Sequence, residues 1–313
     1  MKLIDAVALS RVLPYGALVD AIGRAFAGGV TVPVRAHHDV PVEGGQNSTI
    51  LLMPAWSDDG FIGVKTVIVA PENAGKKLPA VQATYQLFDR DTGRPLALMD
   101  GPELTARRTA CASALAARYL APPEASRLLM IGTGVLAHHL PLAHAAVRPI
   151  SEVRVWGRNS ENAEKCAAAL RTAGLAVETT DDLSSSVTWA DIVSAATLAK
   201  EPIIDGAWLR PGQHIDLVGA FRPDMREADD AALKRARIFC DTKAGAMKEA
   251  GDLSDPLARG VIAESDVLAD LFDLASGSYA FTRDSDDITL FKSAGTAIED
   301  LAAAMLAYRH EAG

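Results

Sequence analysis

The chain has 313 residues, of which 49% are hydrophobic and 23% are charged, and its formal net charge at pH 7 is −9. This length predicts two domains, and the composition is typical of a globular protein rather than a disordered chain. The negative charge, with Lys and Arg spread along the chain instead of gathered in blocks, argues against a nucleic-acid-binding surface. It leaves room for a local anion pocket.

No segment predicts a membrane span or a secretory leader. No apolar run has the length of a span, and Asp5 follows Met1 too closely for the apolar core of a signal peptide. A cytoplasmic location is therefore expected. The cysteines Cys111, Cys166 and Cys240 are far apart and odd in number, which favours small buried side chains over a disulfide. The histidines lack the spacing of a metal site, so no metal is expected.

The first part of the chain combines helical and β-rich segments. Apolar spacing predicts helices over residues 5–27, which end at Gly28-Gly29. Turn-forming segments then separate short β-rich runs, so an antiparallel meander is expected over residues 49–53, 61–69, 83–88 and 95–99. An Ala-rich helix is expected over residues 103–120, and Pro122-Pro123 follows it as a stop.

Strands alternate with helices from about residue 127. Strands are expected at 127–131, 153–156, 175–179, 192–195, 215–218 and 238–241, with helices near 135–146 and 160–173. Such alternation predicts right-handed βαβ units and a doubly wound parallel sheet of the Rossmann type. A strand-like run at 288–291 and a final Ala-rich helix do not continue this pattern. We therefore expect an α/β protein in which a Rossmann domain, 116–287, is inserted into an α+β domain formed by 1–115 and 288–313.

The turn after the first of these strands carries a dinucleotide fingerprint. Leu128-Leu129-Met130-Ile131 ends in Gly132-Thr133-Gly134-Val135-Leu136-Ala137, the strand–turn–helix context that the motif requires. Gly132 allows the tight turn, Gly134 lets the backbone approach a pyrophosphate, and Ala137 allows close packing of helix and strand. The following helix would present free N–H groups to the phosphates.

Arg158 lies at the end of the second strand, in Trp156-Gly157-Arg158-Asn159. NAD-binding units usually have an acid there for the ribose hydroxyls, whereas a basic residue suits the 2′-phosphate of NADP. NADPH is therefore the expected cofactor, with NADH as the alternative. The other interpretation of Arg158 is a solvated loop arginine.

Two more loops follow predicted strands at the edge where open α/β sheets bind ligands. They begin at Thr197-Leu198 and at Val218-Gly219. By composition alone, the charged residues after the second loop are expected to be solvated surface groups: Arg222, Asp224, Arg226 and Glu227.

Cations stand out in the first domain. Lys65 lies in an apolar run, and strand alternation puts it on one face with Val67 and Val69. It is either a functional group or an exposed lysine on an edge strand. Arg108 falls near the start of a helix rich in small residues, where the helix dipole disfavours a cation. That position is an indication of a bound anion.

Together these segments resemble the ornithine cyclodeaminase/mu-crystallin family, and the resemblance spans nearly the whole chain. The motifs that carry it, besides the glycine turn, are Leu52-Met53-Pro54-Ala55, Gly63-Val64-Lys65, Leu87-Phe88-Asp89 with Gly93-Arg94-Pro95-Leu96-Ala97-Leu98-Met99-Asp100-Gly101, Leu104-Thr105-Ala106-Arg107-Arg108-Thr109-Ala110, Arg226-Glu227, Lys248-Glu249-Ala250-Gly251-Asp252 and Phe291-Lys292-Ser293-Ala294-Gly295-Thr296-Ala297-Ile298-Glu299-Asp300. The combination is far more specific than the glycine motif alone.

The resemblance implies a pocket for a small amino-acid-like carboxylate facing a nicotinamide, and a homodimer formed through the first domain. Arg35, Lys65 and Arg108 would hold the carboxylate or polarise the reacting group. The substrate would also be bordered by Phe221, Glu249 and Ser293. The cofactor would lie along Thr84, Arg108, Gly132, Gly134, Val135, Leu136, Arg158, Asn159, Asn162, Thr197, Leu198 and Val218.

Two departures bear on the expected reaction. Ornithine cyclodeaminases have an acid after the Val-Gly-Gly turn and another before Leu-Met-Pro, but this chain has Phe221 and Leu51 at those places. A phenyl group can neither accept a proton nor pair with an ammonium group. Similarity to mu-crystallin and to cyclic-ketimine reductases around Arg158 and Arg222 instead implies reduction of small cyclic ketimine carboxylates to L-proline or L-pipecolate.

Three alternatives stay open at this point. The chain is an ornithine cyclodeaminase, an amino-acid dehydrogenase of the alanine dehydrogenase type, or a non-catalytic small-molecule-binding protein like some mu-crystallins. In every case the expected partner is a small cyclic imine or amino-acid carboxylate, and neither nucleic acid nor membrane is expected.

Overall fold

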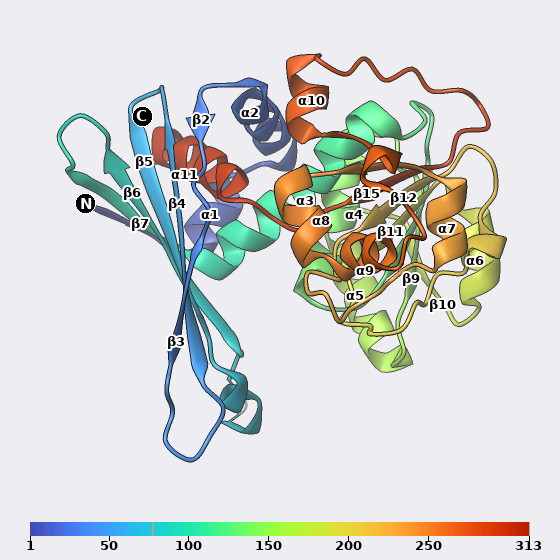
Figure 1. The fold of residues 1–313 in the computed structure, drawn as a ribbon, viewed down its shortest axis with the longest axis horizontal. Coiled ribbons are helices and arrows are strands. Elements are labelled where there is room, and N and C mark those ends of the chain that lie inside the picture. Colours follow the sequence, from blue (N-terminus) through green and yellow to red (C-terminus); the bar gives the residue numbers. More distant parts are fainter. Residues whose placement is uncertain (77, 313) are drawn as a thin grey trace. The chain divides into compact units, whose positions relative to one another are not determined.

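The computed structural model describes residues 1–76 and 78–312, which form two compact units (Figure 1). Unit 1 consists of Met1–Arg108 and the C-terminal segment from Ala297, and unit 2 of Thr109–Thr296. The boundaries differ from those expected. Helix α3 (Gly101–Leu120) passes from one unit into the other at Arg108, and the strand Thr289–Lys292 belongs to unit 2.

Unit 1 is built on an antiparallel meander, as predicted. Its strands are β1 (Lys2–Ile4), β2 (Val30–Thr31), β3 (Ala36–Val40), β4 (Ser48–Ser57), β5 (Phe61–Val69), β6 (Val81–Asp89) and β7 (Pro95–Asp100). Their order in the sheet is β1-β7-β6-β5-β4-β2, with β3 also paired to β4. Strands β4 to β7 are antiparallel neighbours, whereas β1 runs parallel to β7. Strand β5 therefore has a partner on each side.

Unit 1 also contains helices with buried apolar residues. They are α1 (Ala6–Val12), α2 (Tyr15–Ala27), the first part of α3, and α11 (Ala297–Ala312). Asp5 caps α1 by accepting the N–H of Ala8 at 2.8 Å. In α2 the buried residues Leu18, Ile22 and Phe26 recur at helical spacing. Helix α11 packs on β5 and α2 (Figure 1), and it carries the acids described below.

Unit 2 contains a parallel sheet of the Rossmann type, which confirms the predicted fold class. The strands are β8 (Arg127–Ile131), β9 (Glu152–Trp156), β10 (Val177–Thr180), β11 (Ile192–Ala195), β12 (His214–Leu217), β13 (Arg237–Cys240), β14 (Val267–Asp270) and β15 (Thr289–Lys292). Their order is β10-β9-β8-β11-β12-β15-β13-β14. The helices between them are α4 (Leu140–Ala145), α5 (Ser160–Thr172), α6 (Leu183–Trp189), α7 (Asp230–Arg235), α8 (Lys243–Glu249), α9 (Gly251–Ala258) and α10 (Leu271–Ser276).

The strand order creates a switch point between β8 and β11. From β8 the chain winds outward through β9 and β10, and from β11 it winds the other way. Ligands bind outside the carboxyl ends of the strands at such a point. Apolar residues of adjacent strands, such as Leu129, Val193, Ile215 and Leu290, fill one core beneath this edge.

Strand β15 is the main departure from the expected topology. It inserts between β12 and β13 and pairs with both in parallel. Because its backbone hydrogen bonds belong to the parallel sheet, the return to unit 1 begins only at α11. Among the described residues, no single helix is long and apolar enough to cross a membrane; only α1 and α2 taken together, bent by 83°, meet that test.

Candidate active site

Lys65 lies on β5, in the interior of the unit 1 sheet, and its side chain is only 3% exposed. The interpretation as an exposed edge lysine is therefore wrong. Its Nζ lies 2.7 Å from Oδ2 of Asp300 on α11. Burial lowers the pKa of Lys65 to about 8, and the nearby Arg108 adds to this effect while Asp300 opposes it. The ammonium is thus held where it can lose a proton near neutral pH.

Arg108 completes a buried charge cluster. Its Nε donates to Oδ1 of Asp300 at 2.9 Å, and its Nη1 pairs with Glu299. Arg108 does not lie near the start of its helix, as was expected, because α3 begins at Gly101 and Arg108 lies well beyond the first turn. The helix dipole therefore gives no indication of a bound anion. Two carboxylates of α11 offset the cation instead. We call Lys65, Arg108, Glu299 and Asp300 the Lys65 cluster.

The acids of this cluster were not identified as site residues from the sequence. Glu299 and Asp300 are fully buried in the Ala-rich helix α11. An acidic pair within an apolar helix was the available signal, since buried carboxylates need partners. Tyr85, opposite Lys65 in the β5–β6 register, is also fully buried. Burial raises its pKa, and Asp300 adds to this effect.

The other two predicted residues of unit 1 lie at different places along its sheet. Arg35 is half-buried in the link between β2 and β3. Thr84 is an exposed residue of β6, where it pairs in register with Thr66 and Asp100. Their assignment to substrate and cofactor stays a prediction.

In unit 2 the glycine turn lies at the carboxyl end of β8, beside the switch point. Gly132 has φ +118°, and a Cβ added there would lie 2.6 Å from the carbonyl oxygen of Ala196 after β11. The turn therefore packs directly on the neighbouring loop, which only glycine allows. At Gly134 an added Cβ would meet nothing within 4 Å, and Val135 beside it is largely exposed. This open backbone fits the approach of a dinucleotide phosphate.

The helix expected near 135–146 is broken. A 3₁₀ turn covers Val135–His138, and α4 begins only at Leu140. Pro141 explains the break, because it has no N–H to donate to the carbonyl of Ala137. Ala137 is fully buried, as its role in close packing requires. Leu136, the remaining predicted residue of the turn, is half-buried.

Arg158 follows β9 and is exposed. Within the described chain, its side chain forms no hydrogen bond or ion pair. Asn159 accepts the N–H of Asn162 at 2.9 Å and thereby caps α5. The cap fixes the start of α5 directly after Arg158, so this guanidinium stands at the carboxyl end of the sheet with open donors.

The loops after β11 and β12 are neighbours at the same edge. Thr197 and the exposed Leu198 follow β11, and the buried Val218 follows β12. Phe221 lies further along the second loop and is 48% exposed. An apolar side chain of this exposure is suited to contact the methylene groups of a ligand.

The charged residues after Phe221 divide into two kinds. Arg222 and Asp224 are exposed and pair with each other at 2.9 Å, as expected of surface groups. The same expectation is wrong for Arg226 and Glu227, which are buried. Their partners come from other elements: Arg226 pairs with Asp230 and Asp255, and Glu227 contacts both preceding loops.

Glu249 and Ser293 occupy different environments in unit 2. Glu249 is the last residue of α8 and is half-buried. Ser293 follows β15 and is buried, and its N–H donates to the carbonyl of Leu217 at 3.0 Å. This bond places Ser293 at the carboxyl edge of the sheet beside the loop of β12. That both border the substrate stays a prediction.

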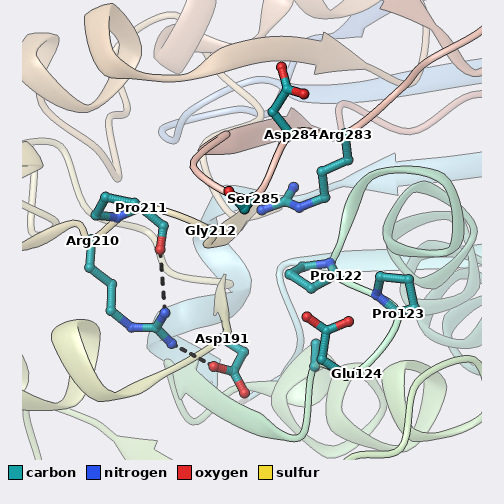
Figure 2. A pocket seen from close by; sticks show the side chains of 11 residues that line it. Pro122, Pro123, Glu124, Asp191, Arg210, Pro211, Gly212, Arg283, Asp284 and Ser285 are labelled. Carbon is teal, nitrogen blue, oxygen red and sulfur yellow. Dashed lines mark hydrogen bonds and ion pairs between the residues drawn. The ribbon is translucent and has the colours of Figure 1, made fainter.

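A cavity of about 460 Å³ lies at the opposite edge of the parallel sheet (Figure 2). It is lined by residues that precede strands, including Glu124, Asp191 and Arg283. Arg210, which also lines it, pairs with Asp191, and Arg283 donates to backbone carbonyls. The cavity contains none of the predicted site residues, and its arginines serve the fold. Within the described ranges, no group of three or more His, Cys, Asp and Glu side chains is arranged to hold a metal ion.

Comparison with known proteins gives consistent results. The model of the ornithine cyclodeaminase/mu-crystallin family matches residues 7–312. A Δ1-pyrroline-2-carboxylate reductase of Paracoccus denitrificans is 40% identical over 96% of this chain and 97% of its own. The rat ketimine reductase mu-crystallin is 38% identical over 94% of this chain and 90% of its own. The structure of Thermococcus litoralis Δ1-pyrroline-2-carboxylate reductase with NADH and L-proline has a TM-score of 0.92 and 36% identity, covering 100% of this chain and 98% of its own.

Proposed function

Because the chain belongs to the ornithine cyclodeaminase/mu-crystallin family, we propose that it reduces small cyclic ketimine carboxylates with a nicotinamide cofactor. The substrates are of the type of Δ1-pyrroline-2-carboxylate and Δ1-piperideine-2-carboxylate, and the products are L-proline and L-pipecolate. The observation that carries this proposal is the end-to-end likeness to Δ1-pyrroline-2-carboxylate reductases, in sequence and in fold.

The cofactor is assigned to the carboxyl edge of the parallel sheet. The open turn at Gly134, with Val135 and Leu136, would hold its pyrophosphate, and the loops after β11 and β12 would carry its nicotinamide end. When bound, the nicotinamide supplies a hydride to the carbon of the C=N bond. The exposed guanidinium of Arg158 favours NADPH, because its fork matches a phosphate group. The structure of the Thermococcus relative contains NADH, so the affinity for NADPH should be compared with that for NADH.

The substrate carboxylate is assigned to the cations of unit 1. Lys65 has three N–H donors, and its ion pair with Asp300 occupies one side of the ammonium. Arg108 is oriented by Glu299 and Asp300, so its guanidinium is held in one position. Together with Arg35 they would orient the carboxylate, and Lys65 would supply the proton that keeps the imine nitrogen positively charged. A protonated imine accepts hydride at C2 and leaves as a neutral or protonated secondary amine.

Phe221 argues against cyclodeamination. The distal amine must lose a proton before it can close the ring and displace the α-amine as ammonia, and neither Phe221 nor Leu51 can accept that proton. Phe221 would instead line an apolar space for the ring methylenes. The amino-acid dehydrogenase and the non-catalytic binder are separated from the reductase by the experiment below.

The test is a substrate panel with the absorbance of the reduced nicotinamide as readout. Δ1-Pyrroline-2-carboxylate and Δ1-piperideine-2-carboxylate should oxidise NADPH, whereas pyruvate with ammonia should not. L-Ornithine should give no proline. Formation of proline and ammonia from ornithine, without net change of the cofactor, would overturn the proposal, and so would a protein that binds NADPH but reduces none of the imines.

We further propose a cytoplasmic homodimer. The three cysteines are free and buried, which suits a reducing compartment. Family resemblance supports a dimer formed through unit 1. Light scattering during size-exclusion chromatography tests the dimer, and a monomeric mass at micromolar concentration would contradict it.

A further inference from the structure

A second group of buried charges lies in unit 2 and has no part in the proposed reaction. Glu227, Asp252 and Lys292 are all fully buried. Lys292 of β15 has its Nζ 3.1 Å from Oδ2 of Asp252 on α9 and 4.0 Å from Oε2 of Glu227. We call these three residues the Glu227 cluster. A charged side chain that is buried away from water needs hydrogen-bond or ion-pair partners. The partners of Glu227 therefore indicate what its carboxylate does.

The carboxylate of Glu227 joins the two loops at the switch-point edge. Thr197 donates its backbone N–H and its hydroxyl to Oε1 at 2.7 and 2.9 Å. Gly219 donates its N–H to Oε2 at 2.7 Å, and the N–H of Ala220 lies 3.4 Å from the same oxygen. One carboxylate oxygen therefore binds the loop after β11, and the other binds the loop after β12.

Glu227 is itself held in place. Its N–H donates to Oδ1 of Asp252 at 2.7 Å, and its carbonyl accepts the N–H groups of Ile203 and Ile204. A Cβ added at Gly219 would overlap the carbonyl oxygen of Thr197 and lie 2.6 Å from Oε1 of Glu227. The two loops thus meet at a distance that only glycine permits at position 219. Glu227 holds them at that distance by accepting hydrogen bonds from both loops.

We propose that Glu227 is a positioning residue for the nicotinamide cofactor, because its carboxylate sets the separation of the loops that carry Thr197 and Val218. The inference rests on the proposed function, which assigns these loops to the cofactor. Glu227 does not act on the substrate. It determines whether both loops are in place before the cofactor arrives.

This role requires an ionised carboxylate. Four donor groups face the two oxygens, and a carboxylate has about four lone-pair positions, all of which then accept. A proton on either oxygen would displace one donor and release one loop. Burial raises the pKa of Glu227 to about 7, and Asp252 adds to this effect, whereas Lys292 and the donors of Thr197 oppose it. Cofactor affinity should therefore fall as the pH falls from about 8 to about 6.

The test measures direct binding of NADH by its fluorescence, in the absence of any imine. NADH is used because it lacks the 2′-phosphate, a group that itself titrates at about pH 6. In Glu227→Gln an amide N–H₂ group replaces one acceptor and faces the donors of one loop. We expect the Kd for NADH at pH 8 to rise about tenfold, since a buried unsatisfied donor has a cost of that order. The pH dependence seen in the wild type should disappear in this variant.

Asp216→Asn is the matched control. Asp216 is a fully buried carboxylate of β12 that accepts from Ser194 at 2.6 Å and contacts His144, but it touches neither loop. This variant should lose stability yet keep the wild-type Kd and pH profile. Hydrogen exchange without cofactor should be faster in at least one of the two loops in Glu227→Gln and unchanged in both loops in Asp216→Asn.

Several outcomes would overturn the inference. A Glu227→Gln protein that binds NADH like the wild type would do so, and so would equal weakening in Asp216→Asn. If Glu227→Gln does not fold, the pH dependence of NADH binding to the wild type is the test, because a Kd that stays constant between pH 6 and 8 contradicts the inference. A wild type that binds NADH but reduces no imine would overturn only the proposed function. A wild type that binds no nicotinamide would overturn both.

Discussion

The two units each contain a buried charge cluster, yet the clusters differ in what their carboxylates bind. In the Lys65 cluster, Asp300 and Glu299 pair with the side-chain cations Lys65 and Arg108. In the Glu227 cluster, Glu227 binds mainly backbone N–H groups of two loops. Acids that hold cations keep those cations oriented for an anionic ligand. An acid that holds backbone keeps loops in place. Burial of a charged side chain therefore does not by itself show whether it takes part in the reaction. The groups that it binds, side-chain cations or backbone N–H groups, indicate its role.

The largest expected effect separates the clusters by activity. Lys65→Met should lower kcat/KM for imine reduction by about 10² to 10⁴, because a proton donor and a carboxylate ligand are both lost. The Kd for NADH should stay within about twofold of the wild type, unlike that of Glu227→Gln. If Lys65→Met keeps the wild-type kcat/KM, Lys65 has no part in the reaction. If its Kd for NADH rises as much as that of Glu227→Gln, the two clusters do not differ in role.

Arg108→Met tests the same comparison through stability. The substitution leaves Asp300 with Lys65 alone and removes the cation paired with Glu299. The free energy of unfolding should fall by about 3 to 5 kcal/mol, measured by urea denaturation. Arg222→Met is the control, because Arg222 pairs with Asp224 at the surface and its loss should not shift the urea midpoint measurably. Equal effects of the two substitutions would refute the special cost of the buried site.

Arg158→Ala tests a cation that lacks a carboxylate partner within the described residues. The Kd for NADPH should rise about tenfold while that for NADH stays unchanged, because only NADPH has the 2′-phosphate that Arg158 would bind. Arg171→Ala is a suitable control, since Arg171 on the neighbouring helix α5 already pairs with Glu164 at 2.6 Å. A parallel loss of affinity for both cofactors would contradict the assignment.

The smallest expected effect is a pH dependence of Lys65. Its pKa of about 8 means that the protonated, active form declines as the pH rises, so kcat/KM should be about half its plateau at pH 8. In Lys65→Arg this alkaline decline should move to higher pH, whereas a decline caused by the imine substrate would not move. The stability changes in the opposite sense. Because the native pKa lies below the value of 10.5 expected for the unfolded chain, the unfolded chain binds the extra proton between these two values. The free energy of unfolding therefore rises from about pH 8 to about pH 10.5, and this gain is lost as the pH falls back to 8.

Much of the fold followed from local patterns. Alternation of apolar residues predicted the meander strands of unit 1, and strand–helix alternation predicted the parallel sheet of unit 2. The helix after the glycine turn was predicted too long, because Pro141 interrupts it. Strand β15 was not placed in the sheet, since its insertion between β12 and β13 depends on hydrogen bonds with strands distant in the sequence.

The candidate site was predicted less evenly. The alternation around Lys65 correctly put it on one face with Val67, and that face is buried. Its partner Asp300 lies more than two hundred residues away, so no local pattern connects them. Glu227 was taken for a surface charge because a charged stretch carries no information about what folds over it. Its carboxylate is buried where the β11 and β12 loops come together with Lys292, and no local pattern connects these elements.

The sequence by itself determined the local conformations. The turn at Gly132, the strand periods and the helix caps depend on residues close together in the chain. The motif resemblance also implied that Arg35, Lys65 and Arg108 are the cations of the site. Only the tertiary structure decided which charges are buried and paired, because desolvation and ion pairing depend on elements such as β5 and α11 that meet only after folding. The glycine turn illustrates both. Its sequence pattern predicted a ligand edge, and the packing of Gly132 against the loop of Ala196 placed that turn beside the loops held by Glu227.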